Sequence, residues 1–281
     1  MPKRPATTPP KRPSVTPDQG PVLFKRLHPP GAPLSALDFV EQLGLPRATD
    51  EHSGGTPTRP YTLLNMVSTA DGRVTIKGRS GPIGNRADYE LFHALRTVAD
   101  GVMIGAGTLR TERYNRIVDD PDERALRLAR GLQEEPCACL LSRHLDLSPE
   151  IPLLADPAAR VVIITPSDAR LLDCAARVDY IRSAPGQPLD LRAAMSELHE
   201  RFAIGVLLCE GGPHLNAELF AQGLIDELLL TLSPKLAGTP PGEQLLLMIA
   251  GASFDPPLEL ELISLLESES HLFLRYRVAH S

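Results

Sequence analysis

Apolar and polar residues follow a regular pattern from about residue 60 to the C-terminus, and the pattern switches between strand-like and helix-like periods. Residues 61–67 predict a first strand. Residues 87–99 predict a helix, because apolar residues recur there at helical spacing and form one inward face: Ala87, Leu91, Ala94, Leu95 and Val98. Continuous apolar runs predict further strands at 101–107, 137–142, 160–166, 205–212 and 227–234. Further helices are predicted at 109–113, 168–176, 191–202 and 214–224.

The C-terminal part holds two strand-like segments, 258–269 and 271–279, which are separated by a polar turn and predict a β-hairpin. Repeated alternation of buried strands with helices is typical of a mostly parallel sheet that helices cover on both faces. The sequence therefore predicts an α/β fold of three layers (α/β/α), with an antiparallel C-terminal hairpin at one edge of the central sheet.

The first 60 residues differ from the rest, because they hold 13 of the 28 prolines. Proline fixes the backbone and removes an amide donor, so we expect residues 1–20 to be a disordered, basic tail and residues 47–59 to be a loop. Between them, apolar residues predict a short helix with one buried face: Leu34, Leu37, Phe39, Val40 and Leu43. We therefore expect residues 21–59 to dock on a main domain at 60–281.

Composition and the lengths of the apolar runs limit the classes of protein to which the chain can belong. Hydrophobic residues make up 42% of the chain and charged residues 23%, and no apolar run is long enough to span a membrane. The N-terminus lacks the apolar core of a signal peptide, so we expect a cytoplasmic protein without a membrane partner. The four cysteines show no metal-ligand spacing and lie in apolar stretches, which favours buried thiols and no metal site.

Charge is unevenly distributed. Residues 1–26 hold six Lys or Arg and one Asp, a net +5, and since the whole chain carries −6, the remainder carries −11. An acidic body without Trp, and with 4% aromatic residues, does not favour nucleic-acid binding. An anionic ligand would have to be held by local groups.

Two predicted strands end in glycine-rich turns that lead into helices. The first turn is Gly105-Ala106-Gly107-Thr108 and the second is Glu210-Gly211-Gly212-Pro213. Glycine lets the backbone approach a ligand, and the free amides at a helix start attract phosphate oxygens. Ligands of such sheets bind beyond the carboxyl ends of the strands. Two such turns in one sheet favour a cofactor that contains a diphosphate.

Other polar residues lie at predicted strand ends: Asn65, Thr69, Asp71, Ser142, Arg143 and Thr165. Hydroxyls and a guanidinium at these places suit a phosphate monoester such as the 2′-phosphate of NADP. The Walker phosphate loop and a complete GxGxxG are absent, as are zinc-deaminase and metalloprotease spacings of histidine, so kinase-type, Rossmann, hydrolase and zinc-deaminase functions lack support.

The ordered motifs PY…STADG at 60–72, GVMIGAGT at 101–108 and EGG at 210–212 resemble the reductase domain of riboflavin biosynthesis. That domain is the C-terminal half of bifunctional deaminase–reductases and also occurs alone. The resemblance extends from about residue 60 to residue 279. The first 60 residues are too short for a deaminase half and hold no zinc signature, so another protein would supply the deamination.

The resemblance implies a dihydrofolate-reductase-like fold, an NADPH cofactor, a homodimer formed through C-terminal strands, and reduction of the ribosyl group of a pyrimidine 5′-phosphate to ribityl. It implies catalytic roles for Asp71 and Glu210. It implies cofactor contacts for Thr69, Gly105, Ala106, Gly107, Thr108, Ser142, Arg143, Thr165, Gly211, Gly212 and Leu215. Substrate contacts are expected from Asn65, Arg96, Glu112, Arg113 and Arg116, although Arg96 could equally be a salt-bridging residue of its helix.

The chain departs from the family pattern at two places. The segment 112–116 (ERYNR) replaces an Asp-Asn/Asp-Pro stretch that helps to form the substrate-phosphate site, and Asn65 stands where bifunctional members often have Lys. Arg113 and Arg116 could bind a phosphate directly, or they could mark an enzyme for another heterocycle. A dihydrofolate or pterin reductase and a catalytically silent NADP-binding protein are therefore the alternatives, and DNA or RNA binding by the tail is weaker still.

Overall fold

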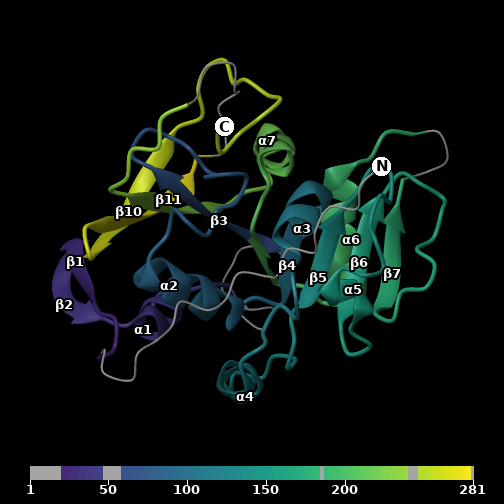
Figure 1. The fold of residues 1–281 in the computed structure, drawn as a ribbon, viewed down its shortest axis with the longest axis horizontal. Coiled ribbons are helices and arrows are strands. Elements are labelled where there is room, and N and C mark those ends of the chain that lie inside the picture. Colours follow the sequence, from purple (N-terminus) through teal and green to yellow (C-terminus); the bar gives the residue numbers. More distant parts are fainter. Residues whose placement is uncertain (1–19, 47–57, 184–186, 240–245, 280–281) are drawn as a thin grey trace.

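The computed structural model describes residues 20–46, 58–183, 187–239 and 246–279. Within them, the strands form a single sheet of eleven in the order β2-β1-β10-β11-β9-β3-β8-β4-β5-β6-β7 (Figure 1). In chain order they are β1 Phe24–His28, β2 Pro30–Leu34, β3 Tyr61–Thr69, β4 Gly101–Gly105, β5 Cys137–Leu141, β6 Arg160–Thr165, β7 Arg177–Arg182, β8 Val206–Cys209, β9 Glu227–Ser233, β10 Leu260–Ser268 and β11 His271–Val278.

The sheet has a parallel part and an antiparallel part. The strands from β9 to β7 in the sheet order run parallel to one another, and the four strands beyond β9 add in antiparallel register. The predicted C-terminal hairpin is confirmed as β10 and β11, which pair from Leu260↔Val278 to Ser268↔His271. Because β3 joins β8 to β9, it lies near the middle of the sheet and its carboxyl end is next to those of β8 and β9.

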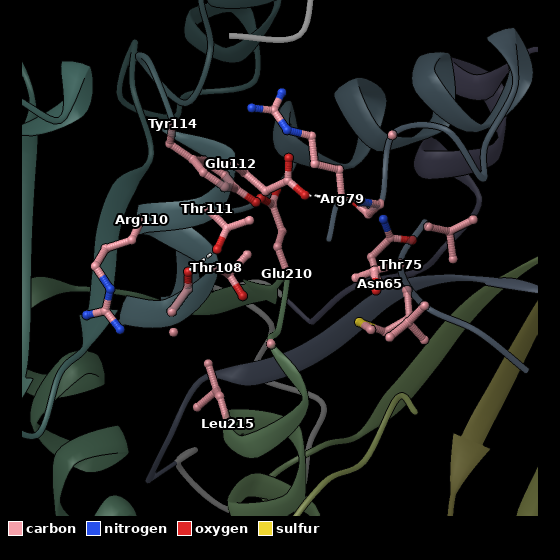
Figure 2. A pocket seen from close by; sticks show the side chains of 18 of the residues that line it. Asn65, Thr75, Arg79, Thr108, Arg110, Thr111, Glu112, Tyr114, Glu210 and Leu215 are labelled. Carbon is pink, nitrogen blue, oxygen red and sulfur yellow. Dashed lines mark hydrogen bonds between the residues drawn. The ribbon is translucent and has the colours of Figure 1, made fainter. Parts of the chain in front are cut away.

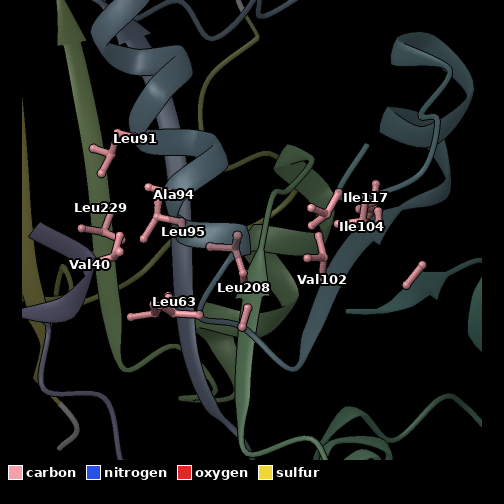
Figure 3. Packing of buried hydrophobic residues seen from close by; sticks show 14 of the residues in the cluster. Val40, Leu63, Leu91, Ala94, Leu95, Val102, Ile104, Ile117, Leu208 and Leu229 are labelled. Atoms are coloured by element: carbon pink, nitrogen blue, oxygen red, sulfur yellow. The ribbon is translucent and has the colours of Figure 1, made fainter. Parts of the chain in front are cut away.

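Helices cover both faces of the sheet, as predicted. They are α1 Ala36–Glu41, α2 Arg86–Arg96, α3 Ala106–Glu112, α4 Pro121–Ala129, α5 Pro152–Ala155, α6 Leu191–Phe202 and α7 Pro213–Ala221. Side chains alternate along each strand, so Leu63 packs in the core under α1 and α2 while the next residue, Leu64, packs in the core under α6 and α7. Figure 3 shows the first of these cores, in which Leu91 and Leu95 of α2 lie above the sheet.

The predicted inward face of α2 is confirmed, and capping explains where the helix begins. The Asn85 side chain accepts a hydrogen bond from the amide of Asp88, which fixes the first turn. In the same way, Asp190 caps α6 through the amide of Ala193. These caps set the bounds of the two helices that pack against opposite faces of the sheet.

Some expectations about the elements were wrong. Residues 168–176 form no helix, because their backbone amides find partners elsewhere: the amide of Leu171 donates to the Tyr180 hydroxyl, and those of Ala175 and Ala176 donate to the carbonyl of Leu154. This segment leads into β7, which the sequence did not predict. The short helices α4 and α5 were also missed.

The N-terminal arm differs in part from its prediction. The helix expected between residues 34 and 43 is α1, but Leu37 points to solvent with 43% of its surface exposed. Before it, β1 and β2 form an unpredicted hairpin that pairs with β10, so the C-terminal hairpin is not the edge of the sheet. The prolines of β2 are tolerated because β2 is an edge strand. The expected tail at 1–20 and loop at 47–59 lie almost entirely outside the described residues.

Candidate active site

One large cavity of about 1190 Å³ opens at the carboxyl ends of β3, β4, β5 and β8. On one side it is lined by the start of α3, the Glu210–Gly212 turn and α7, and on the other by the loop from residue 74 to residue 85 together with α2. Figure 2 shows Glu210 between these sides, with Thr108 and Thr111 on one side and Asn65, Thr75 and Arg79 on the other. This volume is large enough for a dinucleotide and a small substrate.

The two glycine turns are packed directly on each other. The amide of Gly105 donates to the carbonyl of Gly211 at 2.8 Å, and the amide of Glu210 donates to the carbonyl of Met103 at 2.9 Å. A Cβ on Gly212 would lie 2.6 Å from the Thr108 Oγ1 atom, so this close approach favours glycine. Gly211 also has a φ of +80°, which favours glycine. The two turns therefore form one continuous wall.

Both helices that follow these turns begin at the cavity without a side-chain cap. The N-cap residue of α3 is Gly105 and that of α7 is Gly212, and neither supplies a side-chain acceptor to the helix amides. Amides at the start of a helix bind phosphate oxygens when no side chain caps them. This cradle of glycines and open amides fits a diphosphate group.

Glu210 is held by a buried arginine. Its two carboxylate oxygens accept hydrogen bonds from the Nε and Nη2 atoms of Arg96 at 2.7 and 2.8 Å, and the two side chains are 2% and 7% exposed. The Nη1 atom of Arg96 donates to the carbonyl of Ile117. Burial disfavours the charged guanidinium, but the Glu210 carboxylate outweighs it and the pKa of Arg96 is raised.

Tyr114 completes this cluster. Its ring lies 5.5 Å from the Arg96 guanidinium, and its hydroxyl is near enough to the Glu210 carboxylate to feel its charge. Burial, reinforced by the Glu210 carboxylate, raises the pKa of Tyr114 well above its usual value. For Arg96 the sequence left a substrate contact and a salt bridge as alternatives; its guanidinium forms the salt bridge to Glu210 and also donates to Ile117, and a substrate contact stays a prediction.

The other basic residues of the cavity differ in their partners. The Nε atom of Arg116 lies 3.0 Å from Glu135 and 3.5 Å from Asp156, so this predicted substrate residue is engaged by two carboxylates on the far side of the segment. Arg143 pairs with Glu218 at 2.5 Å on the exposed rim. The guanidinium of Arg113 has one hydrogen bond to the part of the chain that the structure describes, to the backbone carbonyl of Glu150 at 3.3 Å.

Most of the residues predicted for the site do line this cavity: Asn65, Arg96, Gly105, Ala106, Gly107, Thr108, Glu112, Arg113, Arg116, Ser142, Arg143, Glu210, Gly212 and Leu215. The structure thus brings together the ends of four strands that are far apart in the sequence. Their individual roles in binding or catalysis stay predictions.

Four predicted site residues do not contribute to the cavity wall: Thr69, Asp71, Thr165 and Gly211. The Asp71 carboxylate accepts hydrogen bonds from the Thr69 hydroxyl and from the amides of Ala237 and Gly238. These bonds lower the pKa of Asp71 to about 2, the Thr69 hydroxyl contributing most. Thr165 is fully buried and accepts from the amide of Ser167. Asp71 thus closes a turn beside the cavity, and its catalytic role stays a prediction.

Sequence reasoning missed most of the loop that forms the second wall. Thr75, Arg79 and Ser80 line the cavity, and the Glu112 carboxylate accepts from the amide and the hydroxyl of Ser80 at 3.1 and 3.2 Å. The clustered glycines at 78, 81 and 84 were the available signal, because they mark an irregular segment between a strand and a helix.

The described residues hold no cluster of three or more His, Cys, Asp or Glu side chains arranged to bind a metal ion. Across the same residues, no helix combines the length and apolar character that crossing a bilayer requires. All four cysteines are free; Cys174 is half-buried and the other three are buried.

The sequence model of the family described as "RibD C-terminal domain" matches residues 60–270. The 2,5-diamino-6-ribosylamino-4(3H)-pyrimidinone 5′-phosphate reductase of Methanothermobacter thermautotrophicus is 27% identical over 182 residues, covering 64% of this chain and 80% of that protein. Riboflavin biosynthesis protein RibD of Synechocystis is 29% identical over 194 residues, but the match spans only 49% of its length.

Among solved structures, a pyrimidine reductase-like protein of Corynebacterium diphtheriae superimposes with a TM-score of 0.71 and 26% identity, covering 88% of this chain and all of that one. The deaminase/reductase of Thermotoga maritima superimposes with a TM-score of 0.62 at 22% identity, covering 79% of this chain and 57% of that one, and it shows the fold alone. The predicted dihydrofolate-reductase-like α/β fold is confirmed.

Proposed function

Because the chain belongs to the RibD C-terminal domain family, we propose that it is an oxidoreductase that reduces the ribosyl group of a pyrimidine 5′-phosphate to a ribityl group with a nicotinamide cofactor. The observation that carries the proposal is the single cavity wall made by the Gly105–Thr108 and Glu210–Gly212 turns. Two strand ends with open helix amides are suited to a dinucleotide, and the remaining cavity is suited to its reaction partner.

The cofactor would lie along this glycine wall, where a Cβ at Gly212 would fill the space. When bound, a nicotinamide supplies the hydride, and the protein supplies its orientation. NADPH is the proposed form, because Ser142 and Arg143 line the same cavity at the end of β5. Arg143 is 54% exposed and its partner Glu218 is 29% exposed, so a 2′-phosphate could compete for the guanidinium.

The substrate would occupy the side lined by α2 and the 74–85 loop. Two arginines of that region, Arg79 and Arg113, line the cavity without a carboxylate partner among the residues that the structure describes. Arg79 directly precedes Ser80, and Arg113 directly follows Glu112. The hydrogen bond between Ser80 and Glu112 holds the loop against α3. A phosphate monoester would find its countercharge here, since Arg96 and Arg116 are already paired.

Glu210 lies between these two regions, fixed by the two hydrogen bonds from Arg96. A carboxylate that is held rigidly next to the reacting carbon can stabilise positive charge that develops there during hydride transfer. The homodimer stays a prediction. The outer edge of β10 is already paired with β1, so a partner chain could not add there.

The test uses absorbance to measure the rate at which the reduced nicotinamide cofactor is oxidised. Three substrates are offered separately: 2,5-diamino-6-ribosylamino-4(3H)-pyrimidinone 5′-phosphate, its deaminated uracil counterpart, and dihydrofolate. We expect turnover with a phosphoribosyl pyrimidine and with NADPH in preference to NADH. Turnover of dihydrofolate alone would replace the proposal with a pterin reductase, and binding of cofactor without any turnover would indicate a silent protein.

A substitution then tests the role of Glu210. Glu210→Gln keeps the shape but removes the charge, so kcat should fall by about 100-fold or more, a far larger change than the change in the Kd for NADPH. Equal turnover by the variant would remove Glu210 from the mechanism.

A further inference from the structure

The 74–85 loop forms one whole wall of the cavity although it has almost no regular structure of its own. Among the described residues, its internal backbone hydrogen bonds are those of an isolated bridge between Ile76 and Arg79 and one from the amide of Ile83 to the carbonyl of Ser80. A loop with so few internal hydrogen bonds depends on contacts from elsewhere in the chain for its position. Whatever holds this loop therefore also sets the shape of the site on that side.

Lys235 supplies that contact from the segment just after β9. Its Nζ atom donates to the carbonyl oxygens of Pro82, Ile83 and Gly84 at 2.9, 2.8 and 3.1 Å. An ammonium has three N–H donors, so all of them are used on three consecutive carbonyls. This arrangement gathers the C-terminal end of the loop around one positive charge.

The backbone of the same segment holds the other end of the loop region. The carbonyl of Lys235 accepts from the amide of Ala70 at 3.0 Å, and the amides of Ala237 and Gly238 donate to Asp71. The segment 235–238 thus binds the chain on both sides of the loop. Lys235 itself does not contribute to the cavity wall, so it acts on the site through the loop.

The side chain of Ile83 anchors the loop at this contact. It is completely buried in the core, and the carbonyl of the same residue is the one that lies closest to Lys235. From this anchor the chain runs back through Ser80 and Arg79 to the cavity. A movement at residues 82–84 would be transmitted to both residues, because Ser80 is only two positions away and its carbonyl accepts from the amide of Ile83 at 2.9 Å.

We propose that Lys235 is a positioning residue that fixes the 78–84 loop as the substrate-side wall of the cavity. Its removal leaves three carbonyls without their donor and frees the loop, while the glycine wall on the opposite side keeps all of its contacts. Substrate binding and cofactor binding should therefore separate in a Lys235 variant. The kinetic part of this inference rests on the proposed reductase function.

The experiment compares Lys235→Met with Lys77→Met in the full chain. Methionine keeps the length of the side chain but has no donor, and Lys77 is an exposed lysine of the same loop. For Lys235→Met we expect KM for the pyrimidinone ribosyl phosphate to rise about tenfold, with the Kd for NADPH and kcat within about twofold of the original chain. Lys77→Met should leave KM for the substrate within about twofold.

Hydrogen exchange gives a readout that does not depend on activity. Amides of residues 78–84 should exchange faster in Lys235→Met, and amides of residues 105–108 should not. Lys235→Gln, which retains two donors, should lie between the two chains and serves if the methionine variant does not fold. If the original chain shows no turnover, the proposed function fails while the exchange result still tests the clamp.

Two results would overturn the proposal. One is unchanged exchange at 78–84 in both Lys235 variants. The other is an equal loss of NADPH and substrate binding, which would mean that Lys235 supports the fold as a whole and not this wall.

Discussion

The two walls of the cavity are built by different kinds of contact. The glycine wall is held by backbone-to-backbone hydrogen bonds between neighbouring strand ends, and behind it lies the buried Glu210–Arg96 pair. The loop wall is held by side chains, chiefly Lys235, which contacts carbonyls about 150 positions away in the sequence. The glycine wall is therefore part of the sheet, whereas the loop wall is a separate segment that side-chain contacts hold against the sheet.

This difference separates two kinds of consequence. A change in the glycine wall disturbs groups that are packed in the core, so stability and cofactor binding should fall together. A change in the contacts of the loop wall should leave the sheet intact and alter mainly the binding of substrate. The predictions that follow test whether this division holds.

The largest effect is expected from Arg96→Met. Methionine keeps an apolar side chain beside Phe92, over whose ring the guanidinium lies at 4.1 Å, but it leaves the 2%-exposed Glu210 without its cation. Breaking a buried ion pair by removing one partner is strongly destabilising, so the free energy of unfolding should fall by about 3–5 kcal/mol. Urea denaturation at neutral pH measures it.

A matched control for this variant is Arg143→Met, which breaks the arginine–carboxylate pair on the rim of the same cavity. Arg143 is 54% exposed, so solvent screens the pair and its loss should lower stability by about 0–1 kcal/mol. Similar losses from the two variants would contradict the view that the glycine wall rests on a buried pair.

An intermediate effect is expected from Gly212→Ala. The new Cβ would lie 2.6 Å from the Thr108 Oγ1 atom, so the Thr108 side chain must rotate or one of the two turns must shift, at a cost of about 1–3 kcal/mol. Cofactor affinity should fall with stability, because both turns form the proposed diphosphate site. Thermal unfolding and NADPH titration measure the two effects.

Two further variants test the cause of that loss. Thr108→Ala in the Gly212→Ala chain removes the clashing oxygen and should restore stability. A Cβ at Gly107 meets no atom within 4 Å, so Gly107→Ala should unfold at the same or a slightly higher temperature. A loss of stability at Gly107 as large as at Gly212 would show that crowding is not the reason.

The same division explains what the sequence could predict. The glycine wall was predictable because each turn follows its own strand within a few residues, and the parallel order of β3, β8 and β4 then brings the turns together. The loop wall was not, since neither Lys235 nor the Ser80–Glu112 contact leaves a local pattern. Composition identifies such residues only as polar.

In the fold as well, elements with local sequence signals were predictable and contacts between distant residues were not. Long periodic elements such as α2 and α6 were predicted with nearly correct bounds, because periodicity and caps are local. The helix expected at 168–176 failed, since its amides are bound by Leu154 and Tyr180, which no local pattern indicates. For Arg96 the sequence left a substrate contact and a salt bridge open, and no local pattern indicates that the partner of its salt bridge is Glu210.

The smallest effect is expected at Asp71, which is exposed and links the start of the loop wall to residues 237–238. Hydrogen bonds from the Thr69 hydroxyl and from two amides lower the pKa of Asp71 from 3.8 to about 2. A carboxyl with a lowered pKa contributes stability that is present above its unfolded value and is lost as the pH falls through its folded value. Asp71→Asn should therefore melt at a slightly lower temperature than the original chain at pH 5 and above, and the difference should close between about pH 4 and pH 2.

Thr69→Val, which removes the strongest donor to Asp71, should raise the pH at which this difference in melting temperature disappears. A difference that stays constant from pH 6 to pH 2 would show that the carboxylate charge of Asp71 plays no part in holding the loop.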